Sequence, residues 1–169
     1  MKSNIVLIGM PGVGKSTIGV ILAKILGYHF LDSDLVIQER EKRLLHQIIA
    51  EDGTKGFLKI ENEVNASLDV ERTIVATGGS VIYGKEAMEH LKEIGKIVYL
   101  KADYSTIRKR LGNLEKRGVA LKPGQTLKDL YDERTALYEK YADVTVDEHG
   151  LGTEETIDAV LRSLNAETA

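Results

Sequence analysis

The hydrophobic positions of this chain fall into short continuous runs and longer stretches with helical spacing. Residues 5–8 are four consecutive apolar residues that stop at Gly9, which is typical of a parallel strand buried on both faces. From residue 15 to 26 the apolar positions recur every three or four residues, which predicts a helix that ends at Gly27. Further short apolar runs predict strands at 28–31, 73–76, 96–100 and 143–146.

Helical spacing fills the intervals between these strands. It predicts helices at 35–43, 45–51, 55–68, 85–93, 105–111, 127–141 and 154–164. The repeated alternation of strand and helix predicts a three-layer α/β fold with a five-stranded parallel sheet. Residues 33–70 would form a helical insert at the edge of the sheet, interrupted by Gly53. Residues 112–125, with three glycines, a proline and several basic residues, predict a mobile lid, and residues 166–169 are expected to be disordered.

Length and composition limit the classes of function that this fold could serve. With 169 residues, of which 43% are hydrophobic, the chain suits a single domain spanning residues 1–169. A net charge of −3 leaves no basic excess for a nucleic-acid surface. No apolar run reaches the roughly 18 residues of a membrane span, the N-terminus lacks a signal-peptide core, and there is no cysteine. We therefore expect a cytoplasmic monomer that binds neither nucleic acid nor membrane.

The glycine-rich segment between the first strand and the first helix carries the clearest chemical signal. Residues 9–16 read G-M-P-G-V-G-K-S and match the pattern G-x-x-x-x-G-K-[ST]. Such a loop turns its backbone N–H groups toward phosphates, while its lysine adds a positive charge and its hydroxyl a ligand for Mg²⁺. An accidental glycine-rich turn is disfavoured by the strand and helix on either side. We expect ATP and Mg²⁺ as cofactors, with the nucleotide held by Gly12, Val13, Gly14, Lys15, Ser16 and Thr17.

Motifs elsewhere in the chain distinguish between the classes of enzyme that use such a phosphate loop. A GTPase should carry an N-K-x-D motif late in the chain, and none is present. Residues 147–150 fit D-x-x-G, but we interpret this match as chance because only one helix follows it. Motor and transporter ATPases need a longer chain, so a small-molecule kinase is favoured.

Two acidic residues follow the second predicted strand. Asp32 and Asp34 would lie at the carboxyl end of that strand, where open α/β sheets bind ligands. One carboxylate could orient or deprotonate an acceptor hydroxyl while the other holds a water of the Mg²⁺ shell. The alternative is a structural role, because Asp and Ser are common helix N-caps.

Together these segments resemble shikimate kinase. The resemblance rests on the phosphate loop, F-L-D-S-D at 30–34, Gly53 with 57–61, A-T-G-G at 76–79, the basic lid and R-x-x-L-Y at 134–138. It spans nearly the whole chain in order. It implies the nucleoside monophosphate kinase fold and the ATP-dependent conversion of shikimate to shikimate 3-phosphate.

The same resemblance implies roles for individual residues. Asp34 would be the catalytic base at the acceptor hydroxyl, and Asp32 would join Ser16 near Mg²⁺. Phe57, Gly78, Gly79 and Arg134 would bind the acceptor, with Arg134 on its carboxylate. Lys15 and Arg117 of the lid would act on the transferring phosphate, and Arg110 would pack on adenine. From the residues alone, Arg134 could instead form an exposed helical ion pair and Arg117 could be a solvated loop charge.

Three departures from the family pattern affect the acceptor side and the lid. The insert reads G-T-K-G-F-L-K-I-E at 53–61, so Leu58 stands where the family has an arginine that binds the substrate carboxylate. Ser80 replaces the third glycine of G-G-G, and the lid reads R-G-V-A at 117–120. Three readings therefore stay open: a shikimate kinase with a weakened pocket, a paralogue acting on another small hydroxy acid, sugar or cyclitol, or a nucleotide-binding module without catalysis.

Overall fold

The computed structural model of the chain describes residues 2–111 and 122–166. Within them, one parallel sheet contains five strands in the order β2-β3-β1-β4-β5. The strands are β1 (Asn4–Ile8), β2 (His29–Asp32), β3 (Thr73–Ala76), β4 (Gly95–Lys101) and β5 (Val144–Asp147). The predicted five-stranded parallel sheet is confirmed. Because β1 and β3 are neighbours in the same direction, the loops that follow them meet at one edge of the sheet.

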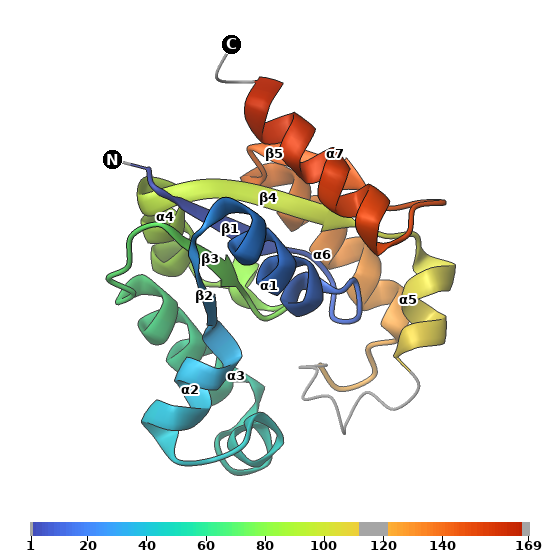
Figure 1. The fold of residues 1–169 in the computed structure, drawn as a ribbon. Coiled ribbons are helices and arrows are strands. Elements are labelled where there is room, and N and C mark those ends of the chain that lie inside the picture. Colours follow the sequence, from blue (N-terminus) through green and yellow to red (C-terminus); the bar gives the residue numbers. More distant parts are fainter. Residues whose placement is uncertain (1, 112–121, 167–169) are drawn as a thin grey trace.

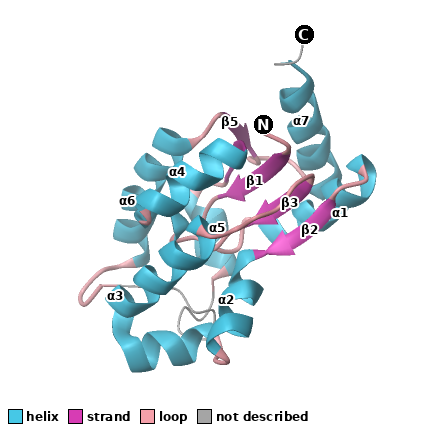
Figure 2. Ribbon diagram, turned by 90° about the vertical axis from the view of Figure 1, so that its left-hand side faces the viewer, coloured by secondary structure: helices cyan, strands magenta, loops and turns pink. Residues whose placement is uncertain are grey.

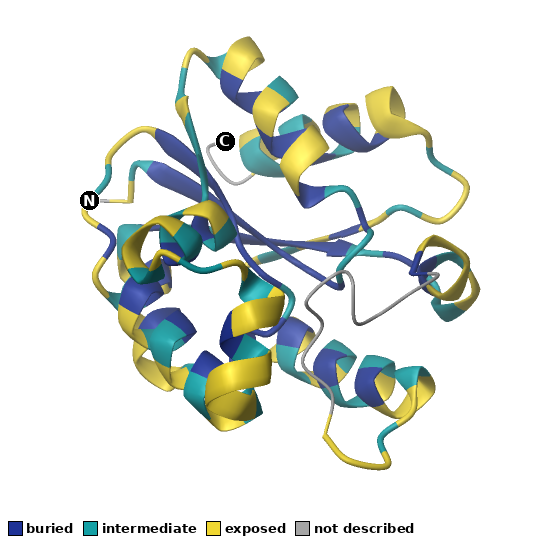
Figure 3. Ribbon diagram, turned by 90° about the horizontal axis from the view of Figure 1, so that it is seen from below, coloured by how far each residue is buried: buried dark blue, intermediate teal, exposed yellow. Residues whose placement is uncertain are grey.

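Helices cover both faces of this sheet. The helices α1 (Lys15–Leu26) and α7 (Thr153–Ala166) pack on one face, and α4 (Lys85–Ile94) and α6 (Leu127–Tyr141) pack on the other (Figure 1). The turned view in Figure 2 separates the three layers. Every residue of β1 is buried, as a strand between two helical layers requires. Figure 3 shows the buried strands enclosed by helices whose outer surfaces are exposed.

A helical arm extends beyond the carboxyl edge of the sheet. It consists of α2 (Ser33–Glu41) and α3 (Leu45–Ala66), which pack against each other. The predicted helices 45–51 and 55–68 are continuous except at Gly53, whose φ of 76° and ψ of 174° bend α3. The short helix α5 (Tyr104–Arg110) lies across from this arm (Figure 1). The arm and α5 therefore flank the loops that follow the strands.

Several boundaries differ from prediction. The strand β2 begins and ends one residue later than expected, because His29 and Asp32 pair with Thr73 and Ala76 of β3. A 3₁₀ turn, η1 (Val81–Tyr83), was not predicted, since three residues are too few for a periodic pattern. Ala166 was expected to be disordered, but it ends α7, which is consistent with the high helix propensity of alanine.

The predicted lid is only partly within the described residues. Residues 112–121, including Arg117, lie outside them. At the described end, Lys122 Nζ lies 3.1 Å from Glu133 Oε1, and Gln125 Nε2 donates to Glu133 Oε2 at 3.2 Å. These contacts attach residues 122–125 to α6. In the described part of the chain, no helix is both long and apolar enough to cross a membrane.

Candidate active site

The phosphate loop joins the buried strand β1 to the helix α1. Gly14 caps the helix in the left-handed region at φ 91°, and Gly12 has φ 88°. Gly9 has φ 150°, and a Cβ there would lie 2.6 Å from the carbonyl oxygen of Leu100. Larger side chains at these positions would strain the backbone, so the glycines of the motif are explained by the loop's conformation.

Lys15 lies inside the curl of this loop. Its Nζ donates to the carbonyl oxygens of Gly9 at 2.6 Å and Met10 at 2.9 Å. Burial lowers the pKa of Lys15 to about 8, although the nearby Asp34 carboxylate opposes the shift. The ammonium group is therefore held at the phosphate loop, where an anionic ligand would stabilise its charged form.

Asp32 connects the phosphate loop to the helical arm. Its Oδ1 accepts from the backbone N–H of Asp34 at 3.0 Å and so caps α2. Its Oδ2 accepts from Ser16 Oγ at 3.1 Å. The helix-cap interpretation is confirmed for Asp32, and the same carboxylate also contacts the predicted Mg²⁺ ligand Ser16.

Two further carboxylates, Asp34 and Glu61, approach each other beside Gly78. A Cβ at Gly78 would lie 2.7 Å from Asp34 Oδ1 and 2.8 Å from Glu61 Oε2, and neither oxygen has a hydrogen-bond partner within the described part of the chain. Burial raises the pKa of Asp34 to about 6; Asp32 adds to this shift and Lys15 opposes it. Burial also raises the pKa of Glu61 to about 7, although a hydrogen bond from Ser80 opposes the shift.

Arg134 supplies a positive charge on the opposite side of Gly79. Its side chain projects from α6 and the residue is only 1% exposed, so the interpretation as an exposed ion pair is wrong. A Cβ at Gly79 would lie 2.8 Å from Arg134 Nη1. The guanidinium carbon lies 5.6 Å from the centre of the Tyr83 ring, within range of a cation–π interaction. Glycine at position 79 therefore leaves room for the guanidinium group.

All these groups line one cavity of about 400 Å³. Phe57 also lines it, so every acceptor-side residue predicted from the sequence is brought together here. The lining also includes five residues to which the sequence assigned no contact, although Ser80 had been noted as a departure on the acceptor side: Pro11, Leu45, Glu61, Thr77 and Ser80. The cavity joins the phosphate loop to a carboxylate-rich pocket that contains a buried guanidinium group. This arrangement suits transfer of a phosphoryl group to a small anionic alcohol.

A second hollow, of about 230 Å³, lies on the other side of the phosphate loop. Arg110 borders it and donates from Nη1 to the carbonyl oxygen of Gly12 at 2.9 Å. Glu148 also lines it, and burial raises the pKa of Glu148 to about 7. Residue 148 lies in the segment whose D-x-x-G match we interpreted as chance. Because Glu148 follows β5 directly, its place at the ligand-binding edge of the sheet could have marked it as a candidate site residue. The remaining lining residues are Val13, Gly14, Thr17, Ile18, Leu151, Gly152, Thr153 and Thr156.

Comparison with known proteins gives the family. The family model described as shikimate kinase matches residues 11–165. The chain belongs to the shikimate kinase family. It is 36% identical over 162 residues to the shikimate kinase of Thermodesulfovibrio yellowstonii, covering 94% of this chain and 93% of that protein. It is 42% identical over 151 residues to the shikimate kinase of Vibrio vulnificus, covering 86% of each. The chain is accordingly an ATP-dependent phosphotransferase with an alcohol acceptor.

Solved structures of shikimate kinases share the fold over nearly their whole length. The enzyme from Acinetobacter baumannii, solved in complex with shikimate, has a TM-score of 0.87 and 30% identity, covering 99% of this chain and 95% of that one. The enzyme from Aquifex aeolicus has a TM-score of 0.85 and 31% identity, covering 98% of both chains.

The structure explains how the shikimate kinase fold accommodates Leu58. This side chain packs against a small apolar cluster of the helical arm and is not among the residues that line the cavity. The cluster consists of Ile37, Ile48, Phe57 and Val64. Position 58 therefore contributes apolar contacts to the arm in this chain.

Proposed function

We propose that this shikimate kinase family member transfers the γ-phosphoryl group of ATP to the 3-hydroxyl of shikimate within the 400 Å³ cavity. The observation that carries the proposal is that one cavity joins three groups. They are the phosphate loop with Lys15, the Asp34 carboxylate and the buried Arg134 guanidinium. Shikimate has hydroxyl groups and one carboxylate, which match these side chains in charge and hydrogen bonding.

Asp34 is proposed as the base. Its pKa of about 6 keeps it ionised at neutral pH, yet close enough to the working pH to accept a proton as the acceptor oxygen attacks phosphorus. Its Oδ1, shielded from water, lacks the hydrogen bond that an acceptor hydroxyl would supply. The nearby Lys15 charge favours the ionised form.

Arg134 is proposed to bind the acceptor's carboxylate. A guanidinium group can form paired hydrogen bonds with a carboxylate, and its burial beside Gly79 removes competition from water. Gly78 and Gly79 line the cavity, so their N–H groups could reach the acceptor, and Phe57 would form an apolar wall. These contacts would direct one hydroxyl toward Asp34.

The nucleotide is proposed to extend from the phosphate loop into the smaller hollow. Its phosphates would lie on the N–H groups of residues 12–17 at the N-terminus of α1, and Lys15 would stabilise charge on the transferring group. Arg110, at the border of the hollow, would pack on the base. Arg117 remains a predicted catalytic cation, because it lies outside the described residues.

Ser16 and Asp32 fit the requirements of Mg²⁺. They present a hydroxyl and a carboxylate oxygen 3.1 Å apart beside the phosphate loop, and both are oxygen donors of the kind that Mg²⁺ prefers. Among the described residues, no group of three or more acidic, histidine or cysteine side chains could hold a metal alone. At phosphate sites Mg²⁺ usually takes its remaining ligands from phosphate oxygens and water. When bound, Mg²⁺ would neutralise charge on the phosphate oxygens.

A second candidate acceptor is another small hydroxy acid, and Leu58 is the observation that favours it. Losing one paired arginine–carboxylate contact should weaken shikimate binding by roughly 10- to 150-fold if Arg134 remains. That loss would weaken the reaction without abolishing it, so shikimate stays the leading acceptor.

An acceptor panel tests the proposal. Purified protein would be given ATP, Mg²⁺ and one of several small alcohols: shikimate, a stereoisomer of it, quinate, and hydroxy acids without a ring. We expect kcat/KM to be highest for shikimate, with the product phosphorylated at the 3-hydroxyl. Higher kcat/KM for another acceptor would overturn the choice of shikimate, and transfer to none would overturn the proposed chemistry.

A further inference from the structure

Ser80 and Glu61 form a buried polar pair in the wall of the cavity. Ser80 Oγ donates to Glu61 Oε1 at 2.6 Å, and both residues are at most 5% exposed. The other oxygen, Oε2, lies beside Gly78, and no group in residues 2–111 and 122–166 forms a hydrogen bond with it. A buried carboxylate with one oxygen bonded and one unsatisfied has a fixed orientation and an unused acceptor site.

The pair links two separate segments of the chain. Glu61 lies on α3 of the arm, whereas Ser80 lies in the loop between β3 and η1. The hydroxyl therefore attaches the arm's carboxylate to the loop that carries Gly78 and Gly79. Ser80 has φ −95° and ψ 2°, a conformation open to alanine, so its hydroxyl can be removed without backbone strain.

Position 58 shows why this attachment matters in this chain. On a helix, residues three apart are neighbours, so a long cationic side chain at 58 could reach Glu61. Here that position holds Leu58, which packs into the apolar cluster of the arm. The hydrogen bond from Ser80 thus stabilises a carboxylate that residue 58 cannot pair with.

We propose that Ser80 is a positioning residue for acceptor specificity, which holds Glu61 so that Oε2 receives a hydroxyl group of the acceptor beside Asp34. The inference rests on the proposed function, because it concerns the same acceptor. Glu61 and Asp34 would then contact different hydroxyls, and Arg134 would bind the carboxylate. A ring with hydroxyls on adjacent carbons would meet all three groups, whereas a simple hydroxy acid would meet only two.

The pH dependence of the KM for the acceptor reports the charge state of Glu61. This dependence would not change if Ser80 had a purely structural role. The charged groups that influence it are Asp34 from α2, Arg134 from α6 and Lys15 from α1. Asp34 raises its pKa and the two cations lower it, as does the Ser80 hydroxyl. Removing that hydroxyl should raise the pKa of Glu61, so that it becomes protonated at a higher pH.

The test compares Ser80→Ala with Ser33→Ala by steady-state kinetics from pH 5.5 to 9. Ser33 is the control because it is also a buried serine near the cavity, and its Oγ has no hydrogen-bond partner among the described residues. For Ser80→Ala we expect the KM for shikimate to rise about tenfold or more at neutral pH, since a hydrogen bond to a charged group is lost. The acidic rise in that KM should begin at a higher pH than in the wild type. The KM for ATP should stay within about twofold, and Ser33→Ala should match the wild type.

Making Ser80→Ala in a Glu61→Gln variant distinguishes loss of Glu61 positioning from a general loosening of the cavity. If Ser80 acts through the Glu61 carboxylate, Ser80→Ala should add little to the effect of Glu61→Gln. Three results would overturn the inference: an unchanged KM for shikimate in Ser80→Ala, a rise equal at every pH, or effects that are fully additive in the double variant. If the wild type fails to phosphorylate shikimate at all, it is the proposed function that fails, and this result is seen before any variant is compared.

Discussion

At the scale of single residues, the site depends on two buried carboxylates whose ionised forms are destabilised by the loss of water around them. Asp34 and Glu61 both have pKa values raised by burial, to about 6 and about 7. Asp32 differs, since it caps α2 and accepts from Ser16. Asp32 therefore stabilises the fold as a helix cap. Asp34 and Glu61 lower the stability of the fold when they are ionised, as is common for groups in a functional site.

Replacing Asp34 should separate activity from stability. Because the native pKa of Asp34 lies above its ordinary value of 3.8, the native state binds the proton more tightly than the unfolded state does. Its contribution to the free energy of unfolding therefore falls as pH rises from about 4 to about 6. Above about pH 6 the destabilisation of the native state by the ionised carboxylate has reached its full size. We expect Asp34→Asn to raise the unfolding temperature at pH 8 by a few degrees, with less gain at pH 4, and to lower kcat about 100-fold or more.

Asp32→Ala is the contrasting variant for this prediction. Loss of a helix cap should lower the free energy of unfolding by about 1 kcal/mol, so the two neighbouring substitutions should shift the unfolding temperature in opposite directions. Calorimetry at both pH values, with turnover measured beside it, checks the pair. Near-normal kcat in Asp34→Asn would return this residue to a structural role.

Lys15 should give nucleotide binding a basic pH limit. Its pKa of about 8 in the ligand-free protein means that it loses its charge as pH rises through that value. We expect ATP affinity, measured by calorimetry without acceptor, to fall from pH 7 to pH 9.5. Lys15→Arg, which stays charged, should show a flatter profile. Lys15→Ala should nearly abolish transfer, and turnover close to wild type in that folded variant would contradict the assignment.

Leu58→Arg tests whether the acceptor pocket keeps room for the family's arginine. If shikimate is the acceptor, the new guanidinium should lower its KM by about tenfold or more, with little change in the KM for ATP. Lys59→Arg is the control, because one residue along a helix turns the side chain by about 100° away. Weaker transfer to the true acceptor in Leu58→Arg would indicate an unmatched buried charge and a different acceptor.

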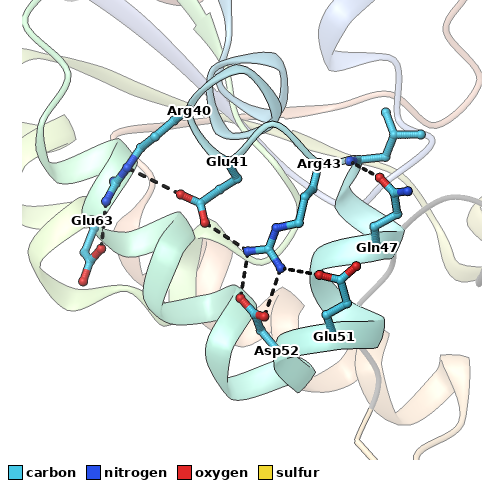
Figure 4. Close-up of polar contacts among 8 residues, drawn as sticks. Arg40, Glu41, Arg43, Gln47, Glu51, Asp52 and Glu63 are labelled. Carbon is cyan, nitrogen blue, oxygen red and sulfur yellow. Dashed lines mark hydrogen bonds and ion pairs between the residues drawn. The ribbon is translucent and has the colours of Figure 1, made fainter.

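At the scale of elements, the apolar cluster of the helical arm is supplemented by a charged network around one arginine in the turn between α2 and α3. Figure 4 shows Arg43 directed at three carboxylates. Its guanidinium donates to both oxygens of Asp52 at 3.0 and 2.9 Å, to Glu51 at 2.9 Å and to Glu41 at 3.1 Å. Asp52 directly precedes the bend at Gly53. The network therefore fixes the turn and the first segment of α3 relative to α2.

Arg43→Ala should loosen the arm without unfolding the sheet. Leu45, Phe57 and Glu61 of this arm line the cavity, so we expect the KM for shikimate to rise severalfold while the KM for ATP stays constant. High salt should produce a smaller version of the same change in the wild type, because ion pairs near the surface are screened. Arg40→Ala is the comparison variant, since Arg40 also joins α2 to α3, through Glu63, but lies outside the network at the turn. Equal effects of both variants would show that the Arg43 network has no special role.

The elements differ in how far the sequence predicts them. Strands β1 and β3 and helices α1 and α6 were predicted closely, because buried runs and helical periodicity are local signals. The interruption of the arm at Gly53 was also predicted, and the backbone of Gly53 is indeed non-helical, because a glycine within helical spacing is a local signal as well. The turn η1 was missed because it is too short for any period to be seen.

At the scale of the whole molecule, the site forms where distant segments meet. The phosphate loop and Asp34 could be predicted because a motif and a strand end mark them. Glu61 and Ser80 were noted only as parts of family motifs and Glu148 only in a chance match, and the places of all three in the site follow from the strand order and the packing of the arm. The groups proposed for chemistry, together with Phe57, Gly78, Gly79 and Arg134 of the acceptor wall, could therefore be predicted, whereas the contacts of Glu61, Ser80 and Glu148 could not.

In the proposed reaction, the γ-phosphoryl group moves from ATP to the 3-hydroxyl of shikimate within one cavity, and Asp34 accepts the hydroxyl proton. Single-turnover transfer from γ-labelled ATP tests it most directly, with enzyme in excess and the label followed in ATP, shikimate phosphate and inorganic phosphate. We expect the wild type to transfer the label to shikimate, whereas Asp34→Asn, with ATP still bound, should leave the label in ATP over the same time. Label released as inorganic phosphate regardless of shikimate, or equal transfer by Asp34→Asn, would contradict the proposed reaction.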